Sequence, residues 1–335
     1  MSFTITAVNP LEHAQEIKTL FVTHERPEFP AFFDRAYGLG VRAGGASWIG
    51  RDHAGQVVMH VACFPHRFRF GEREVVGGLM MNALVATSYR SFFPARALFK
   101  RATEDLRARR DMDFVYTDPN EQAKAVMDMC GFATVGKLAR YVLPIGDRRW
   151  ILDRGLRLVH AGVGVVRWSQ RRALVACPAG DVPATRFEAP AGDSPRLRPY
   201  HGAERYATRL EGYPAPSDRW FTLQRNGDAR ASAAALLVRG PDIEGVATLL
   251  TVRRDPREGL AELTPDLVAA LRARGCTRLQ VWTLAESLFA GELRRAGFVP
   301  RDTAASIVAI ALSPAGDAVL RSAHLWEITS LDCDR

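Results

Sequence analysis

In the first half of the chain, hydrophobic residues are spaced as in strands in some segments and as in helices in others. Residues 3–8 alternate between apolar and polar as a strand does, and residues 11–24 then carry apolar side chains at helical spacing. A second short helix follows and ends at Gly40. We predict strands over 47–52, 56–64, 66–70 and 75–87, a helix over 94–110, a strand over 113–117, a helix over 120–129 and a strand over 135–145. The order is β-α-α-β-β-β-α-β-α-β, with an antiparallel meander in its middle.

The later part of this order returns in the second half. Residues 115–132 read VYTDPNEQAKAVMDMCGF and residues 281–298 read VWTLAESLFAGELRRAGF, and each copy ends in Gly-Phe. Internal repeats mark duplicated architecture. Here we predict strands over 230–240 and 246–254, a helix over 265–275, a strand over 277–284, a helix over 285–297 and a strand over 305–313. The pattern therefore predicts an α+β protein of two tandem domains, each a mostly antiparallel central sheet flanked by helices.

Chain length supports the same division, because 335 residues exceed what one hydrophobic core usually supports. We predict an N-terminal domain over 1–147, an interdomain helix and linker over 148–180, and a C-terminal domain over 181–335. The apolar run within 150–172 is too short and too polar to span a bilayer. It could lie on a membrane as a basic amphipathic helix, but we expect it to pack on protein. Residues 178–199, rich in Pro, Ala, Gly and Asp, are predicted as a loop.

Composition places the chain among soluble globular proteins, with 47% hydrophobic and 24% charged residues. The N-terminus lacks the residue order of a signal peptide, so we expect a cytoplasmic protein. The sequence has five scattered cysteines without CxxC or zinc-like spacing. They are predicted to be structural thiols, with neither a disulfide framework nor a metal site.

The formal net charge is +8 and comes from arginine rather than lysine. An excess of positive charge favours an anionic partner, which could be nucleic acid, a membrane surface or a phosphorylated small molecule. We expect no nucleic-acid binding, because the arginines are spread along the chain and no nucleic-acid-binding motif occurs. We also expect no membrane association, and the oligomeric state stays open.

The first candidate site is the turn between the strand ending near residue 87 and the following helix. The first turn of a helix has unpaired N–H groups and a positive dipole end, which bind phosphate. Pro94 suits the first helical position because it has no N–H to leave unpaired, and Arg90 and Arg96 add positive charge. An ordinary strand–helix junction would fit these residues as well.

Residues 1–145 resemble the GNAT (Gcn5-related N-acyltransferase) family in strand order and in two motifs. The family's turn, Pro-x-Tyr-Arg-Gly-x-Gly-x-Gly/Ala, aligns with residues 87–95, which keep Tyr89, Arg90 and Ala95. The second motif is an Asn followed by an amphipathic helix and Gly-Phe. The residues from Asn120 to Gly131 have the same spacing.

The resemblance implies coenzyme A or acyl-CoA as co-substrate. In the family, the strand before the turn binds the pantetheine arm and the turn's N–H groups hold the pyrophosphate. On this chain it assigns the arm to Leu84 and Val85. It assigns the rest of cofactor binding to Arg90, Ser91, Phe92, Phe93, Ala95, Arg96 and Asn120.

The sequence also departs from the family. Ser91 and Phe93 occupy places where glycine often lets phosphate approach the backbone. Met127 stands where many members have the tyrosine that protonates the leaving thiolate, and a thioether cannot donate a proton. Gly77 and Gly78 stand near the usual position of a basic carboxylate.

Other residues must therefore supply the acid and the base. Base candidates are His60 and His66 on the meander strands and Asp118 just past the fifth strand; Tyr116 is the candidate acid. A lone histidine on a strand can equally be structural, and a water relay could replace the base.

The second half lacks a comparable turn, so we expect it to shape the acceptor pocket rather than bind a second cofactor. Tandem GNAT proteins that acylate nucleotide-linked amino sugars or antibiotics have this layout. Two short stretches resemble theirs, Asp218 to Phe221 and Trp326 to Asp334.

We predict an N-acyltransferase that moves an acyl group from acyl-CoA to the amine of a small molecule. A nucleotide-linked amino sugar is favoured because many arginines suit a diphosphate. The alternatives are acylation of an antibiotic, peptide or protein amine, and a non-catalytic, degenerate GNAT that binds acyl-CoA.

Overall fold

The computed structural model describes residues 3–24, 26–145, 172–176, 196–199, 218–225, 232–239, 245–254 and 260–329. They belong to two compact units, and each unit combines segments from both halves of the sequence. The first unit consists of Met1–Lys137, Ser194–His201 and Ala305–Trp326. The second consists of Leu138–Asp193, Gly202–Ala304 and Glu327–Arg335. The predicted division at 147 and 181 stays a prediction, and the expected interdomain helix lies outside the described residues.

The first half of the chain follows the predicted order of elements. These are β1 (Thr4–Val8), α1 (Ala14–Thr23), α2 (Phe29–Arg42), β2 (Ala46–Arg51), β3 (Val57–Phe70), β4 (Arg73–Val85), α3 (Phe92–Arg109), β5 (Phe114–Thr117), α4 (Glu121–Met129) and β6 (Ala133–Pro144). A short 3₁₀ turn, Thr87–Tyr89, precedes α3. The stretches predicted as two strands, 56–64 and 66–70, form the single strand β3, because Pro65 removes only its own N–H from the ladder.

The sheet of the first unit has the order β1-β2-β3-β4-β5-β13, where β13 is Val299–Ala311. Among these described strands only the β4–β5 pair is parallel, and the β2–β3–β4 meander is antiparallel as predicted. The short strand β8 (Leu197–Pro199) pairs with the end of β3. The prediction of a loop throughout 178–199 is therefore wrong for β8, whose three residues give too little periodicity to reveal a strand.

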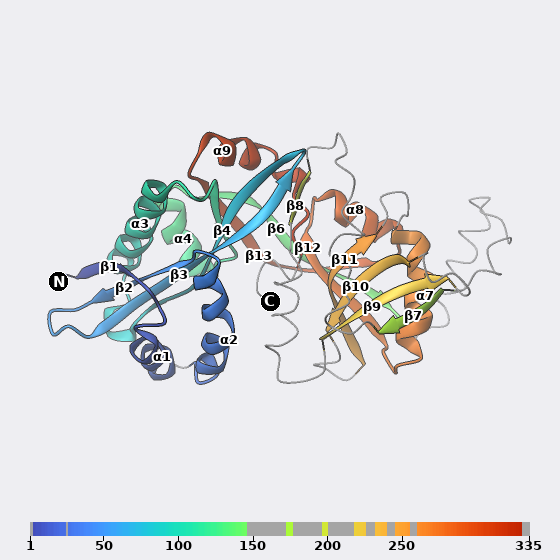
Figure 1. The fold of residues 1–335 in the computed structure, drawn as a ribbon, viewed down its shortest axis with the longest axis horizontal. Helices are drawn as coiled ribbons and strands as arrows, with labels where there is room; N and C mark the ends of the chain where they lie inside the picture. Colours follow the sequence, from blue (N-terminus) through green and yellow to red (C-terminus); the bar gives the residue numbers. More distant parts are fainter. Residues whose placement is uncertain are drawn as a thin grey trace. The chain divides into compact units, whose positions relative to one another are not determined.

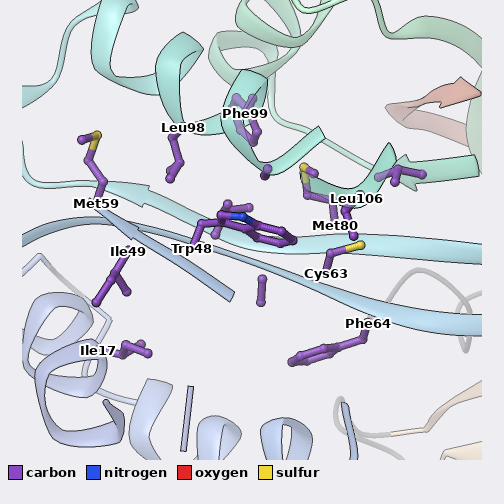
Figure 2. Close-up of a cluster of buried hydrophobic side chains, with 14 of the residues drawn as sticks. Ile17, Trp48, Ile49, Met59, Cys63, Phe64, Met80, Leu98, Phe99 and Leu106 are labelled. Atoms are coloured by element: carbon purple, nitrogen blue, oxygen red, sulfur yellow. The ribbon is translucent and has the colours of Figure 1, made fainter. Parts of the chain in front are cut away.

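Helices cover both faces of this sheet, with α3 and α4 on one side and α1 and α2 on the other (Figure 1). Alternation along β2 sends neighbouring side chains to opposite layers (Figure 2). Trp48 packs beside Leu98 and Phe99 of α3, whereas Ile49 points toward Ile17 of α1. The Trp48 Nε1–H also donates to Asp105 of α3 at 2.8 Å. A buried core on each face thus fixes the strands that carry the candidate site.

The strands of the second unit follow the order β6-β12-β11-β10-β9-β7. Its strands are β7 (Arg172–Ala176), β9 (Asp218–Arg225), β10 (Ser232–Arg239), β11 (Val246–Arg254) and β12 (Arg278–Leu284). Its helices among the described residues are α7 (Leu260–Arg272) and α8 (Leu288–Arg295), and their apolar faces cover a second buried core. The sequence pattern did not predict β7, β9 or the helix α9 (Pro314–Arg321) of the first unit.

Candidate functional site

Strand β4 has an edge that its neighbour covers only in part. The parallel ladder with β5 runs from Gly77–Phe114 to Leu79–Tyr116 and stops there, while β4 continues to Val85. Beyond Leu79, no strand in the described part of the chain pairs with β4 on the side away from β3. Backbone N–H and C=O groups along this open edge are available to an extended, amide-bearing ligand.

Two glycines allow β4 to pair with β5 in this parallel ladder. A Cβ built on Gly77 would lie 2.5 Å from the Phe114 ring, and one on Gly78 would lie 2.5 Å from Cys63 Sγ. Real Cβ atoms do not approach other atoms this closely, so any side chain at either position would force its neighbours to move. Packing therefore explains why this strand has no carboxylate at these positions.

A β-bulge interrupts β4 beside the open edge. The register with β3 shifts between His60 and Ala62, and Asn82 adopts a left-handed conformation with φ 52°. His60 Nδ1 donates to the Asn82 carbonyl at 2.9 Å, which ties the bulge to β3. Sequence reasoning missed this feature, although an Asn inside an apolar strand is a usable signal because Asn tolerates this conformation.

The register distinguishes the two residues expected to hold a pantetheine arm. The Ala86 N–H donates to the Val58 carbonyl of β3 at 2.8 Å. Backbone groups alternate in direction along a strand, so those of Val85 face the open edge. Leu84 instead directs its backbone toward its partner His60. Of the two, only Val85 directs its N–H and C=O toward the open side, where the C=O also accepts from Arg90 Nε.

Side-chain contacts fix the turn that follows β4. The Tyr89 hydroxyl donates to Asp52 at 2.8 Å, and this hydrogen bond lowers the pKa of the Asp52 carboxyl. Arg90 Nε donates to the Val85 carbonyl at 3.3 Å, which brings the guanidinium next to the open edge. The turn residues that the family resemblance singled out are thus held by their own hydrogen bonds.

Helix α3 begins at Phe92, so the prediction that Pro94 takes the first helical position is wrong. Pro94 is the third residue, where its missing N–H is still tolerated because first-turn N–H groups have no intrahelical partner. Ser91 is the N-cap residue, yet its side chain makes no capping hydrogen bond. First-turn N–H groups thus remain without a side-chain cap, and Arg96 is exposed.

The other predicted cofactor residues differ in exposure and role. Phe92 is half-buried, whereas Phe93 leaves 75% of its surface exposed. Ala95 packs against the core. Asn120 caps α4, where its side chain accepts from the Ala123 N–H at 2.8 Å. The Asn of the second motif therefore has a demonstrable structural role.

His66 and Tyr116 come together across β4, although they lie on different strands. The His66 Nδ1 and Tyr116 hydroxyl are 2.6 Å apart. Tyr116 is fully buried and contacts the aromatic rings of Phe68, Phe114 and Trp326. Tyr116 also forms the last pair of the β4–β5 ladder, so this hydrogen bond lies where the two strands separate.

His60 has a different environment. Burial lowers its pKa to about 4, so the ring is neutral near pH 7 and a weak base. Its Nε2 is buried without a hydrogen-bond partner among the described residues, while its Nδ1 holds the bulge. These properties suit positioning of the strand better than proton transfer. Asp118 lies half-buried just past the end of β5.

Other groups contribute less to the chemistry of this region. Met127 is 2% exposed and belongs to the core of the first unit. Burial raises the pKa of the Cys63 thiol to about 12, which makes it a poor nucleophile. The described ranges contain no group of three or more His, Cys, Asp or Glu residues that could hold a metal ion. They also contain no helix long and apolar enough to cross a membrane.

No model of a known protein family and no curated protein sequence matches the chain. Solved structures do match its fold. A probable N-acyltransferase of Enterococcus faecalis V583 aligns over 93% of this chain and 73% of its own, with a TM-score of 0.66 and 10% identity. The tandem GNAT protein from the clavulanic acid biosynthesis pathway aligns over 93% of this chain and 99% of its own, with a TM-score of 0.52 and 15% identity.

A third similar structure is N-myristoyltransferase of Saccharomyces cerevisiae with bound myristoyl-CoA. It aligns over 92% of this chain and 79% of its own, with a TM-score of 0.51 and 12% identity. At these identities the likeness concerns the fold, and it confirms the mixed α+β architecture predicted from the sequence pattern. The chain has the fold of the GCN5-related N-acyltransferases.

Proposed function

We propose that this protein is an N-acyltransferase that moves an acyl group from acyl-CoA to the amine of a small molecule. The observation that carries the proposal is the open edge of β4, which leads directly into an uncapped helix start flanked by arginines. Pantetheine has two amides that can pair with a strand edge, and the pyrophosphate can bind to helix N–H groups.

The cofactor would follow the chain from β4 into α3. The N–H and C=O of Val85 would pair with the pantetheine arm, and the bulge at Asn82 would direct a backbone N–H toward the thioester carbonyl. The pyrophosphate would bind to N–H groups from Ser91 to Phe93, with charge from Arg90 and Arg96.

In the proposed reaction the neutral amine attacks the thioester carbonyl carbon. A new C–N bond forms, the C–S bond breaks, and coenzyme A leaves as a thiolate. The amine loses one proton and the thiolate gains one. The His66–Tyr116 pair would pass that proton, with His66 as base and Tyr116 as acid, because their polar atoms are in hydrogen-bond contact beside the strand separation.

For the acceptor we propose a small molecule that carries an anionic group, with a nucleotide-linked amino sugar as the first choice. The support is the net charge of +8 carried mostly by arginine, which binds diphosphates in bidentate fashion. Polycationic acceptors such as aminoglycosides suit this charge less well.

Calorimetric titration with coenzyme A, followed by thiol release from acyl-CoA in the presence of candidate amines, tests the proposal. We expect binding, and release of free thiol that depends on the amine. Binding without turnover would favour an acyl-CoA-binding protein, which the absence of the usual acid and base at Met127 and Gly77 also allows. Absence of binding would overturn both.

A further inference from the structure

The second unit contains an opening between two parallel strands like that of the first. β11 and β12 pair from Val246–Arg278 to Thr248–Gln280 and then separate, although β11 continues to Arg254 and β12 to Leu284. β11 also has a register shift with β10 near this point. The second unit thus repeats both the incomplete parallel ladder and the irregularity beside it.

The segment Glu327–Thr329 lies in this opening. Thr283 of β12 forms an antiparallel bridge with Thr329. A strand has two edges, and β6 covers one edge of β12 along its whole length, including Ala139 opposite Thr283. The bridge to Thr329 is therefore on the edge that faces β11.

Burial and a side-chain hydrogen bond strengthen this contact. The Thr283 hydroxyl donates to the Ile328 carbonyl at 2.7 Å. Thr283 and Ile328 are fully buried, and Thr329 is 8% exposed. The segment Glu327–Thr329 therefore occupies the opening as an added strand does, with one apolar side chain sealed from solvent.

We propose that the β11–β12 opening is a second site for an extended, amide-bearing chain, and that Glu327–Thr329 is its resident ligand. The segment takes the place along β12 that the pantetheine arm takes between β4 and β5, so it excludes acyl-CoA from the second unit. This inference rests on the proposed function of the first unit.

Tethering explains why an external chain does not displace the segment. A ligand joined to its site by a short stretch of chain is present at an effective concentration in the millimolar range. Acyl-CoA must exceed this concentration before it can compete. Removal of the segment should leave an opening with free backbone groups on both strands, which a pantetheine amide can use.

The test compares coenzyme A binding to four full-length or C-terminally shortened proteins by calorimetry. They are the wild type, Arg90→Ala, a chain that ends at Trp326, and that shortened chain with Arg90→Ala. We expect one site in the wild type, which Arg90→Ala weakens. The shortened chain should bind a second, weaker equivalent that Arg90→Ala leaves unchanged, and a synthetic peptide of residues 327–335 should abolish this second event, whereas a scrambled peptide should not.

A folded shortened chain that binds only the one equivalent sensitive to Arg90→Ala would overturn the inference, as would two equivalents in the wild type. If the wild type binds no coenzyme A, the proposed function is overturned instead. Coenzyme A binding that occurs only in the shortened chain would still support a blocked site in the second unit. If the shortened chain does not fold, Thr329→Pro replaces it, because proline cannot donate a backbone hydrogen bond. Thr329→Ala is the matched control and should behave as the wild type.

Discussion

The two units share a strand opening but differ in what lies at it. In the first unit the β4–β5 ladder ends beside the Tyr116–His66 hydrogen bond, and the open edge of β4 leads into an uncapped helix start. In the second unit the corresponding β11–β12 ladder ends at Gln280, and Thr329 bridges to β12 beyond it. A duplicated backbone feature thus borders the site that we propose for acyl-CoA in one unit, whereas in the other unit Thr329 bridges to it.

The residues that pair in the two parallel ladders differ as well. β4 contributes Gly77, Gly78 and Leu79, whereas β11 contributes Val246, Ala247 and Thr248. The first ladder needs glycine because large side chains of β3 and β5 crowd it. Neighbouring side chains thus pack closely against β4 at Gly77 and Gly78, which suits a site that needs fixed geometry.

The largest expected effect comes from removal of the Tyr116 hydroxyl. Tyr116→Phe should lower kcat by about 100-fold with little change in KM, because a positioned proton donor contributes at least this much. The matched control is Tyr141→Phe in the second unit. Tyr141 is also fully buried, and its hydroxyl donates to the Ala285 carbonyl. Equal losses of kcat in both variants would show that Tyr116 acts only through stability.

Acid should weaken the first unit before the second. The pKa of His60 is lowered to about 4 by burial, so the unfolded chain binds a proton first as the pH falls below the ordinary value of 6.5. The free energy of unfolding should decrease by about 2 kcal/mol between pH 7 and pH 5. The bulge partners in the second unit, Leu237 and Val238, do not titrate.

Hydrogen exchange of backbone amides at pH 5 and pH 7 checks this expectation. Amides of β4 should lose more protection than those of β11, and His60→Gln should remove the difference. The measurement stays at or above pH 5, because the stability that Glu16 contributes through its low pKa of about 2 is lost mainly as the pH falls through 4.5 and below. Equal loss in both units would contradict a role of His60 in holding the bulge.

Packing around the glycines gives a smaller effect. Gly78→Ala places a methyl group against Cys63 and Met112, and we expect a loss of about 1–3 kcal/mol in the free energy of unfolding by denaturant. The reverse change in the second unit, Ala247→Gly, should cost about 1–2 kcal/mol, through added chain entropy and the loss of a buried methyl group. A neutral Gly78→Ala would mean that the ladder of the first unit is not crowded.

The smallest effect concerns Arg90, in the turn between β4 and α3. Arg90→Ala should raise the Kd for coenzyme A about tenfold, as expected for one charge-assisted hydrogen bond. Arg107→Ala, at the other end of α3, removes the same charge from an exposed position and is the control. If both variants bind coenzyme A equally well, Arg90 does not contact a phosphate.

Sequence periodicity predicted most of the first unit, because long amphipathic elements such as α3 and β4 carry a strong signal. It failed for β8, which is too short to show a period, and for the start of α3, where Pro94 tolerates several positions in the first turn. The site was predicted only in part. Arg90 and the turn came from a motif, but the bulge at Asn82 depends on a conformation that no single residue fixes.

The sequence by itself determined the repeated α+β pattern, the excess of arginine and the identity of the residues at the turn. The tertiary structure decided which of them meet. His66 and Tyr116 are fifty positions apart and come within 2.6 Å only because β4 lies between their strands. Thr283 and Thr329 meet only because β12 has one free edge. Hydrophobic spacing specifies the face that a residue occupies, whereas its partner across the sheet depends on register and strand order, which long-range packing decides.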